Sequence, residues 1–260
     1  MAEADLRMRR ELSPVWERLR GGVIVSCQAP PGHPMRSPSV MACIAEAVTA
    51  SGAVGVRIDT PEHIQAVRQA VDAIVVGLWK DGQDDVYITP TLEHAQAVAL
   101  TGADIVAIDG TQRPRPDGRR LAEVIDALHA EYDVLVLADV ATAAEGIAAV
   151  RCGADAVATT LAGHTDRSLA MDGSAAEALA EMYARLDVPV IAEGGIVRPE
   201  QACDALRSGA WSVVIGKAIT SPDWITAGFV EATAPLRAAT RQAAVTCDGS
   251  APSPRPLMGP

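Results

Sequence analysis

The stretch TGADIVAID, residues 101–109, contains the pattern that decides the fold. Its Gly can take the left-handed conformation that ends a helix, and the apolar run after it suits a buried strand. The same unit precedes an apolar run at three further places, as SGAV from Ser51, CGAD from Cys152 and SGAW from Ser208. The sequence therefore predicts one structural unit, a helix that ends at Gly followed by a strand, repeated along the chain.

Short apolar or β-branched runs recur from one end of the chain to the other, and there are eight: Val23–Gln28, Val54–Asp59, Ile74–Lys80, Ile105–Asp109, Val134–Asp139, Ala156–Leu161, Pro189–Glu193 and Ser212–Lys217. The segments between them place apolar residues at helical spacing, as at Leu121, Val124, Ile125 and Leu128. This alternation predicts a parallel sheet, and eight βα units are typical of a single-domain (β/α)8 TIM barrel. A doubly wound open sheet is the alternative, but no GxGxxG follows the first strand.

The expected helices also carry start signals. Proline stands where a first helical residue is expected in Ser37-Pro38, Thr60-Pro61, Arg198-Pro199 and Ser221-Pro222. We expect residues 1–20 to form a helix that covers the barrel floor and residues 21–239 to form the barrel. Residues 240–260 are polar, Pro-rich and without periodicity, which predicts a disordered tail.

Composition limits the possible functions. With 260 residues, 49% hydrophobic but only 3% aromatic, the core must consist of Ala, Val, Ile and Leu. The net charge of -11 argues against binding nucleic acid or an anionic membrane surface. No apolar run is long enough to span a membrane. The five cysteines show no CxxC spacing, which favours free thiols and a cytoplasmic protein.

Polar residues end almost every predicted strand, where a parallel barrel holds its active site. They are Gln28, Arg57, Asp59, Lys80, Asp109, Asp139, Thr160, Glu193 and Lys217. Any single one is explained equally well by a strand that ends at water, and for Asp59 and Asp109 we predict no more than that. The recurrence on one rim favours a site.

Lys80 and Glu193 are the candidate catalytic pair. Lys80 ends the run AIVVGLWK, and an apolar wall that disfavours the charged form lowers a lysine pKa and makes it a general base. Glu193 ends VPVIAE directly before two glycines. The structural alternative is a salt bridge from Lys80 to Glu193 or Asp139 that only closes the barrel top.

The last two strands carry a candidate phosphate site. Gly194 and Gly195 follow the seventh strand, and Gly216 and Lys217 follow the eighth, where barrels commonly bind phosphate through backbone amides. Arg198 is a further candidate counter-charge. Arg113 and Arg115 in DGTQRPRPDG fit either a basic clamp or a Pro-rich loop that borders the site, and we favour the loop. The histidines form no HxH or HExxH pattern, so we predict no metal.

Eight motifs together resemble the N-acetylmannosamine-6-phosphate 2-epimerase family of bacterial sialic acid catabolism: IVSCQA at Ile24, GAVGVR at Gly52, ITPT at Ile88, DGTQRPRPDG at Asp109, LADVAT at Leu137, TTLAGHT at Thr159, PVIAEGG at Pro189 and VVIGKAIT at Val213. The resemblance runs from about Gly21 to Phe229. It implies a cofactor-free epimerase in which Lys80 moves the C2 proton and Glu193 assists.

The resemblance also implies that three further residues contact the substrate: Gln28, Arg57 and Asp139. Two departures bear on substrate binding. Gly195 stands where the family usually carries a long basic residue, and Ser221 stands where it often has arginine.

The expected function is interconversion of N-acylmannosamine 6-phosphate and N-acylglucosamine 6-phosphate by a cytoplasmic homodimer without cofactor. Lys80 would remove the C2 proton of the open-chain sugar, and either Glu193 or the same lysine would return a proton to the other face. Two alternatives stay open. One is a Schiff-base aldolase that acts through the rim lysine, and the other is a non-catalytic sugar-phosphate binding protein.

Overall fold

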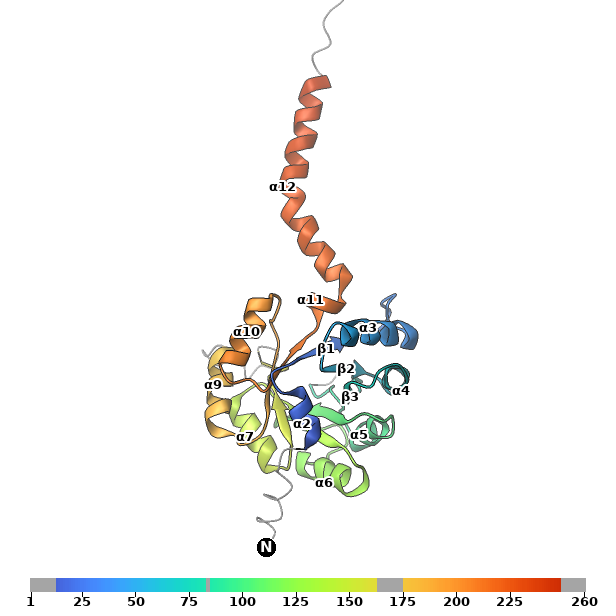
Figure 1. The fold of residues 1–260 in the computed structure, drawn as a ribbon, viewed down its shortest axis with the longest axis vertical. Helices are drawn as coiled ribbons and strands as arrows, with labels where there is room; N and C mark the ends of the chain where they lie inside the picture. The colour runs from blue at the N-terminus through green and yellow to red at the C-terminus, as the bar shows by residue number, and fades with distance from the viewer. Residues whose placement is uncertain (1–12, 83–84, 163–174, 249–260) are drawn as a thin grey trace, which may run out of the picture. The chain divides into compact units, whose positions relative to one another are not determined.

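The computed structural model describes residues 13–82, 85–162 and 175–248, and it contains a closed eight-stranded barrel (Figure 1). The strands are β1 (Val23–Cys27), β2 (Gly55–Asp59), β3 (Ile74–Leu78), β4 (Ile105–Asp109), β5 (Leu135–Asp139), β6 (Ala156–Ala158), β7 (Val190–Glu193) and β8 (Ser212–Ile215). Each pairs in parallel with the next, and β1 closes the ring on β8, with Ile24 opposite Val214. The predicted (β/α)8 barrel is confirmed, and the open sheet is excluded.

Helices surround the barrel, and several of them begin or end at the predicted signals. They are α3 (Pro38–Ala50), α4 (Pro61–Ala70), α5 (Leu92–Ala99), α6 (Leu121–Glu131), α7 (Ala143–Arg151), α9 (Ala175–Arg185), α10 (Pro199–Arg207) and the single turn α11 (Lys217–Thr220). Proline begins α3, α4 and α10 as predicted. The repeated Gly has a positive φ each time, from 84° at Gly102 to 113° at Gly209.

The core has two layers because successive side chains of a strand face opposite ways. On β3, Ile74, Val76 and Leu78 lie in the barrel interior, and Val75 packs outward with Val98 of α5. Both faces of the strand are therefore apolar, and its sequence reads as a continuous hydrophobic run.

A short helix, α2 (Pro14–Leu19), lies at the N-terminal ends of the strands. Trp16 and Leu19 are buried with Ile24 and Ile74, and the indole N–H of Trp211 donates to the Trp16 carbonyl at 2.7 Å. The short helix α2 therefore lies at the barrel floor, opposite the predicted site. Residues 1–12 of the expected helix lie outside the described part.

Helix α12 (Pro222–Asp248) belongs to a second unit, residues 221–260. The prediction of a disordered tail from residue 240 is wrong for residues 240–248, which are helical. Ala, Arg and Gln dominate the stretch APLRAATRQAA, and their high helix propensity continues the helix without an apolar stripe. Residues 249–260 lie outside the described part. In the part described, no helix is long and apolar enough to cross a membrane.

Candidate active site

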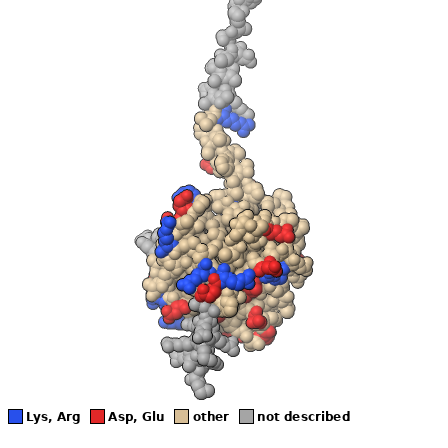
Figure 2. Space-filling model, in the orientation of Figure 1, with Lys and Arg blue, Asp and Glu red and all other residues tan. Residues whose placement is uncertain are grey.

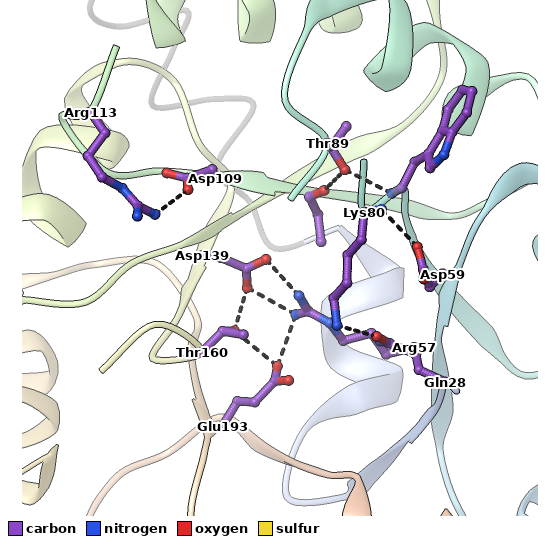
Figure 3. Close-up of polar contacts among 12 residues, drawn as sticks. Gln28, Arg57, Asp59, Lys80, Thr89, Asp109, Arg113, Asp139, Thr160 and Glu193 are labelled. Carbon is purple, nitrogen blue, oxygen red and sulfur yellow. Dashed lines mark hydrogen bonds and ion pairs between the residues drawn. The ribbon is translucent and has the colours of Figure 1, made fainter. Parts of the chain in front are cut away.

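Strand alternation directs the predicted site residues into the barrel. On β2, Val56 and Ile58 pack outward against the helices, so Arg57 and Asp59 face the interior. The same alternation brings polar side chains from six further strand ends to the same mouth (Figure 3): Gln28, Lys80, Asp109, Asp139, Thr160 and Glu193.

Arg57 is the centre of this group. Its side chain is 1% exposed and forms a two-pronged pair with Asp139, at 3.0 Å from Nη1 and 2.6 Å from Nη2. Nη1 also donates to Oε2 of Glu193 at 2.9 Å. Burial alone would lower the pKa of Arg57, but Asp139 and Glu193 raise it well above its usual value. A permanently charged guanidinium thus holds two carboxylates from β5 and β7 in fixed positions.

Two threonines at the end of β6 complete the link, and the sequence analysis assigned no role to either. The Thr160 hydroxyl contacts both carboxylates, at 2.5 Å from Oδ1 of Asp139 and 3.1 Å from Oε2 of Glu193. Thr159 accepts from the Glu193 N–H at 3.0 Å and donates to its carbonyl at 2.8 Å. Their place at a strand end was the only signal, because hydroxyls are also common where strands simply meet water.

Lys80 lies at the mouth just after β3. Its Nζ donates to Oε1 of Gln28 at 2.7 Å, and its backbone N–H donates to Oδ1 of Asp59 at 2.8 Å. Desolvation lowers the pKa of Lys80, opposed by Asp59 and assisted by Arg57. The side chain is exposed at the mouth, so water screens part of this effect.

The structural alternative for Lys80 required a salt bridge to a rim carboxylate. Among the described residues, Glu193 and Asp139 pair with Arg57, and no ion pair joins either of them to Lys80. The lysine is therefore not used to close the barrel top.

Glu193 is perturbed in the opposite sense. Burial raises its pKa, Arg57 opposes the rise, and the neighbouring carboxylate of Asp139 adds to it. The side chain is 15% exposed, so it is accessible from the mouth, whereas Asp139 is fully buried. Two groups on one rim, a lysine with a lowered pKa and a carboxyl with a raised one, are suited to exchange protons with one bound molecule.

The DGTQRPRPDG loop borders the mouth, as predicted. Arg115 is buried and donates to the backbone carbonyls of Asp109 at 2.8 Å and Thr89 at 2.6 Å. Arg113 pairs with Asp109 at 2.7 Å. Arg115 therefore anchors the loop to neighbouring backbone, and Arg113 pairs locally with Asp109. Both contacts favour a bordering loop over a basic clamp. Tyr87 has its pKa raised by burial and by Asp139, and it is a neighbour of the site that sequence analysis missed.

The candidate phosphate residues lie on adjacent strand ends, since Glu193 pairs with Val214. Gly194 and Gly195 are exposed and have φ of 109° and 70°. Lys217 begins α11 and is exposed. Arg198 is the residue before α10 and is also exposed. The geometry brings these groups to one side of the mouth, and their role in phosphate binding stays a prediction.

Across the described ranges, no group of three or more His, Cys, Asp and Glu side chains is placed to hold a metal ion. Cys27, Cys43, Cys152 and Cys203 are free thiols.

The chain is similar to known proteins in sequence and in fold. The family model described as "Putative N-acetylmannosamine-6-phosphate epimerase" matches residues 41–235. A Cutibacterium acnes protein named "Putative N-acetylmannosamine-6-phosphate 2-epimerase" is 48% identical over 216 residues, which cover 82% of this chain and 94% of that protein. A protein of the same name from Thermosynechococcus vestitus is 46% identical over 208 residues, covering 79% of this chain and 90% of the relative. The solved structure of the N-acetylmannosamine-6-phosphate 2-epimerase from Clostridium perfringens matches with a TM-score of 0.80 at 35% identity, covering 85% of this chain and 97% of that one.

Proposed function

The chain belongs to the family of N-acetylmannosamine-6-phosphate epimerases, and we propose that it interconverts N-acylmannosamine 6-phosphate and N-acylglucosamine 6-phosphate. The observation that carries this proposal is that Lys80, whose pKa is lowered, and Glu193, whose pKa is raised, lie at the same barrel mouth. Inversion at C2 requires a C–H bond to break and re-form on the other face. That chemistry needs a base and an acid but no electron carrier.

The C2 proton is acidic only when the sugar is open and C1 is an aldehyde, because the carbonyl then accepts the electron pair. Neutral Lys80 takes the proton, and the C1–C2 unit becomes a planar enolate. The lowered pKa of Lys80 makes its neutral form more accessible near neutral pH than that of an ordinary lysine.

Glu193 is the proposed acid for the opposite face. Its raised pKa increases the fraction that carries a proton, and contacts from Arg57 and Thr160 fix its orientation. In the reverse direction the roles exchange, with the Glu193 carboxylate as base and the Lys80 ammonium as acid. Return of the proton by Lys80 alone is the competing route, and substitution of Glu193 separates the two.

The negative charge that develops on the C1 oxygen needs a donor. The Gln28 carboxamide accepts from Lys80 through Oε1, which leaves its Nε2 group as a donor beside the base. Arg57 adds positive potential, but its burial and its contacts to Asp139 and Glu193 favour a supporting role. We propose that Gln28 and Glu193 contact the substrate. Arg57 and Asp139 hold the Glu193 carboxylate in place.

Phosphate binding is assigned to the ends of β7 and β8. The backbone at Gly194 and Gly195 has the left-handed conformation that leaves amides free to face an anion, and Gly216 and Lys217 lie on the next strand end. A local positive site is needed because the whole chain carries -11.

A cytoplasmic homodimer is the proposed form of the enzyme. The exposed apolar side chains of α12 support it: Phe229, Val230 and Leu236 are 72%, 57% and 71% exposed, and Leu236 lies seven positions after Phe229. That spacing places Phe229 and Leu236 on one helix face, which a second copy of α12 can cover.

Figure 2 shows Lys and Arg mixed with Asp and Glu on the visible face of the barrel, which together with the net charge supports our proposal that the protein does not bind nucleic acid.

The direct test is to incubate the purified protein with N-acetylmannosamine 6-phosphate and follow the C2 configuration by NMR. We expect the glucosamine epimer to appear without added metal or nucleotide, and in the presence of EDTA. No conversion under these conditions would refute the proposal.

Borohydride trapping separates an epimerase from the Schiff-base alternative. The chain contains two lysines, Lys80 and Lys217, so any reduced adduct on a side chain is located unambiguously by peptide mass analysis. We expect no adduct on Lys80 with the substrate present. A trapped adduct there would favour imine chemistry instead.

A further inference from the structure

An ion pair outside the proposed catalytic group lies directly beside it. Nη1 of Arg36 is 3.2 Å from Oδ2 of Asp59, and the two side chains are 22% and 4% exposed. Asp59 is the last residue of β2, and Arg36 belongs to the loop between β1 and α3. The pair therefore joins the ends of two neighbouring strands.

Each member of the pair also holds a backbone group next to a functional side chain. Asp59 accepts from the backbone N–H of Lys80 at 2.8 Å through Oδ1. Arg36 donates to the carbonyl of Ala29, the residue after Gln28, at 2.6 Å. With the 2.7 Å contact between Lys80 Nζ and Gln28 Oε1, these bonds form a closed ring. Asp59 and Arg36 hold the two backbones, and the two functional side chains close the ring.

We propose that Arg36 and Asp59 are positioning residues that hold the Lys80 amine against the Gln28 carboxamide. This inference rests on the proposed role of Lys80 as the C2 base. A flexible lysine side chain gains most from such support, since its own contacts fix only its tip and the backbone must be held separately. Loss of the ring leaves both side chains present but free to separate, and misplacement by about 1 Å can lower turnover about 100-fold.

The pair also sets the charge that Lys80 experiences. After desolvation, which lowers the pKa of Lys80, the largest influence is the Asp59 carboxylate, which raises it; Arg57 lowers it, and Glu193 and Asp139 raise it. Removing the negative charge at Asp59 must therefore lower the pKa of Lys80 further. Removing the positive charge of Arg36 must leave the Asp59 carboxylate uncompensated and raise the pKa of Lys80.

A further titratable group lies beside the pair. His63 of α4 is buried, and burial followed by the charge of Arg36 lowers its pKa. The two variants of the pair have opposite expected effects on the pKa of Lys80.

A second ion pair at the other end of β3 provides a matched control. Arg68 and Asp104 are 3.0 Å apart, and their side chains are 26% and 29% exposed. Asp104 accepts from the Val75 N–H, and Arg68 donates to the Val71 carbonyl. The bonding is the same in kind, but it lies at the N-terminal end of the strands, away from the proposed catalytic residues.

The experiment compares Asp59→Asn and Arg36→Met with Asp104→Asn and Arg68→Met, measuring kcat, KM, the pH profile of kcat/KM and the melting temperature. We expect the first two to lower kcat about 10- to 100-fold with KM changed far less. The acidic limb of the profile should move to lower pH in Asp59→Asn and to higher pH in Arg36→Met. The control pair should lose thermal stability with kcat and pH profile unchanged.

The inference is overturned if all four variants lose stability alike while kcat and the acidic limb stay as in the wild type. Arg36→Lys keeps the charge at a partly exposed position, so it should fold and retain the wild-type pH limb even if Asp59→Asn does not fold. Lys80→Met separates this failure from failure of the proposed function. An inactive Lys80→Met beside wild-type behaviour of the Arg36 and Asp59 variants rejects the inference alone, and an active Lys80→Met rejects both.

Discussion

At the scale of single residues, the decisive feature is that neighbours set the chemistry of otherwise ordinary groups. The chain has two lysines, and they face different surroundings. Burial lowers the pKa of Lys80, with Arg57 adding to the effect and Asp59 opposing it, and Lys217 is exposed at the start of α11. The same side chain is therefore proposed as a base in one place and as a phosphate counter-charge in the other.

Replacement of Lys80 by Met tests the first assignment. Met keeps the unbranched apolar stem and removes the amine, so we expect kcat to fall by about 100- to 10,000-fold with KM changed much less. In deuterated water the wild type should introduce label at C2 and the variant should not. Lys217→Met serves as the comparison and should mainly raise KM. Wild-type exchange in Lys80→Met would make Glu193 the principal base.

Glu193→Gln tests whether a second group returns the proton. Gln retains the shape and can still accept from Arg57, but it cannot exchange a proton. We expect the variant to exchange the C2 hydrogen of N-acetylmannosamine 6-phosphate with solvent while inversion falls at least about 100-fold, as NMR in deuterated water would measure. Inversion at the wild-type rate would show that Lys80 serves both faces.

The pH dependence follows from the same two groups. The base must be neutral, so kcat/KM should rise as pH rises through the lowered pKa of Lys80. The acid must be protonated, so kcat/KM should fall as pH rises through the raised pKa of Glu193. A bell-shaped profile is expected for the wild type, and Glu193→Gln should change its alkaline limb. A profile that keeps the same alkaline limb in that variant would assign the limb to another group.

At the scale of elements, the loop after β4 is held by buried side chain to backbone contacts. Arg115 bonds to the carbonyls of Asp109 and Thr89, so it joins this loop to the segment after Lys80. Sequence analysis could place the loop at the mouth from its position after a strand. It could not identify which arginine was buried, because that depends on where the Thr89 carbonyl lies.

Arg115→Met should therefore destabilise the protein. Two charge-assisted bonds are lost and two buried carbonyls lose a donor, which predicts a loss of about 2 to 4 kcal/mol and a melting temperature lower by about 5 to 15 °C. Arg120→Met is the control, since the Arg120 side chain is 80% exposed and, among the described residues, its ion pair is the one with Glu123. Equal melting temperatures for the two variants would contradict this role of Arg115.

At the scale of the whole molecule, α12 carries the proposed contact between two copies. Phe229 and Leu100 provide a matched pair for the test, because both are 72% exposed and only Phe229 belongs to α12. Phe229→Glu should shift the mass measured by light scattering from dimer towards monomer, and Leu100→Glu should not. A monomeric wild type, or a Phe229→Glu variant that remains a dimer, would reject this surface as the interface.

The fold was predictable because its signals are local. Gly52, Gly102, Gly153 and Gly209 all end helices with a positive φ, which a residue with a Cβ adopts only under strain. The apolar runs between them predicted all eight strands to within one or two residues at most ends, and three at the C-terminal end of β6. The tail was mispredicted because helix propensity without an apolar stripe leaves little periodic signal.

The site was predictable only in part. That Gln28, Arg57, Lys80, Asp139 and Glu193 share one rim follows from strand parity, since each lies at or just after a strand end on an inward position. Which of these residues contact one another does not follow from parity. Arg57 pairs with the two carboxylates that were candidate partners of Lys80. Asp59, for which the sequence supported no role, accepts from the backbone N–H of Lys80.

The sequence by itself thus determined the barrel, its polar rim and the family, because repeated turns, strand periodicity and motifs are properties of neighbouring residues. Only the tertiary structure decided which rim residues touch. Arg57 and Asp139 are 82 positions apart, and Arg57 and Glu193 are 136 apart. Closure of the ring between β1 and β8 brings such distant positions to one mouth, and the contacts there are set by distances that no local pattern encodes.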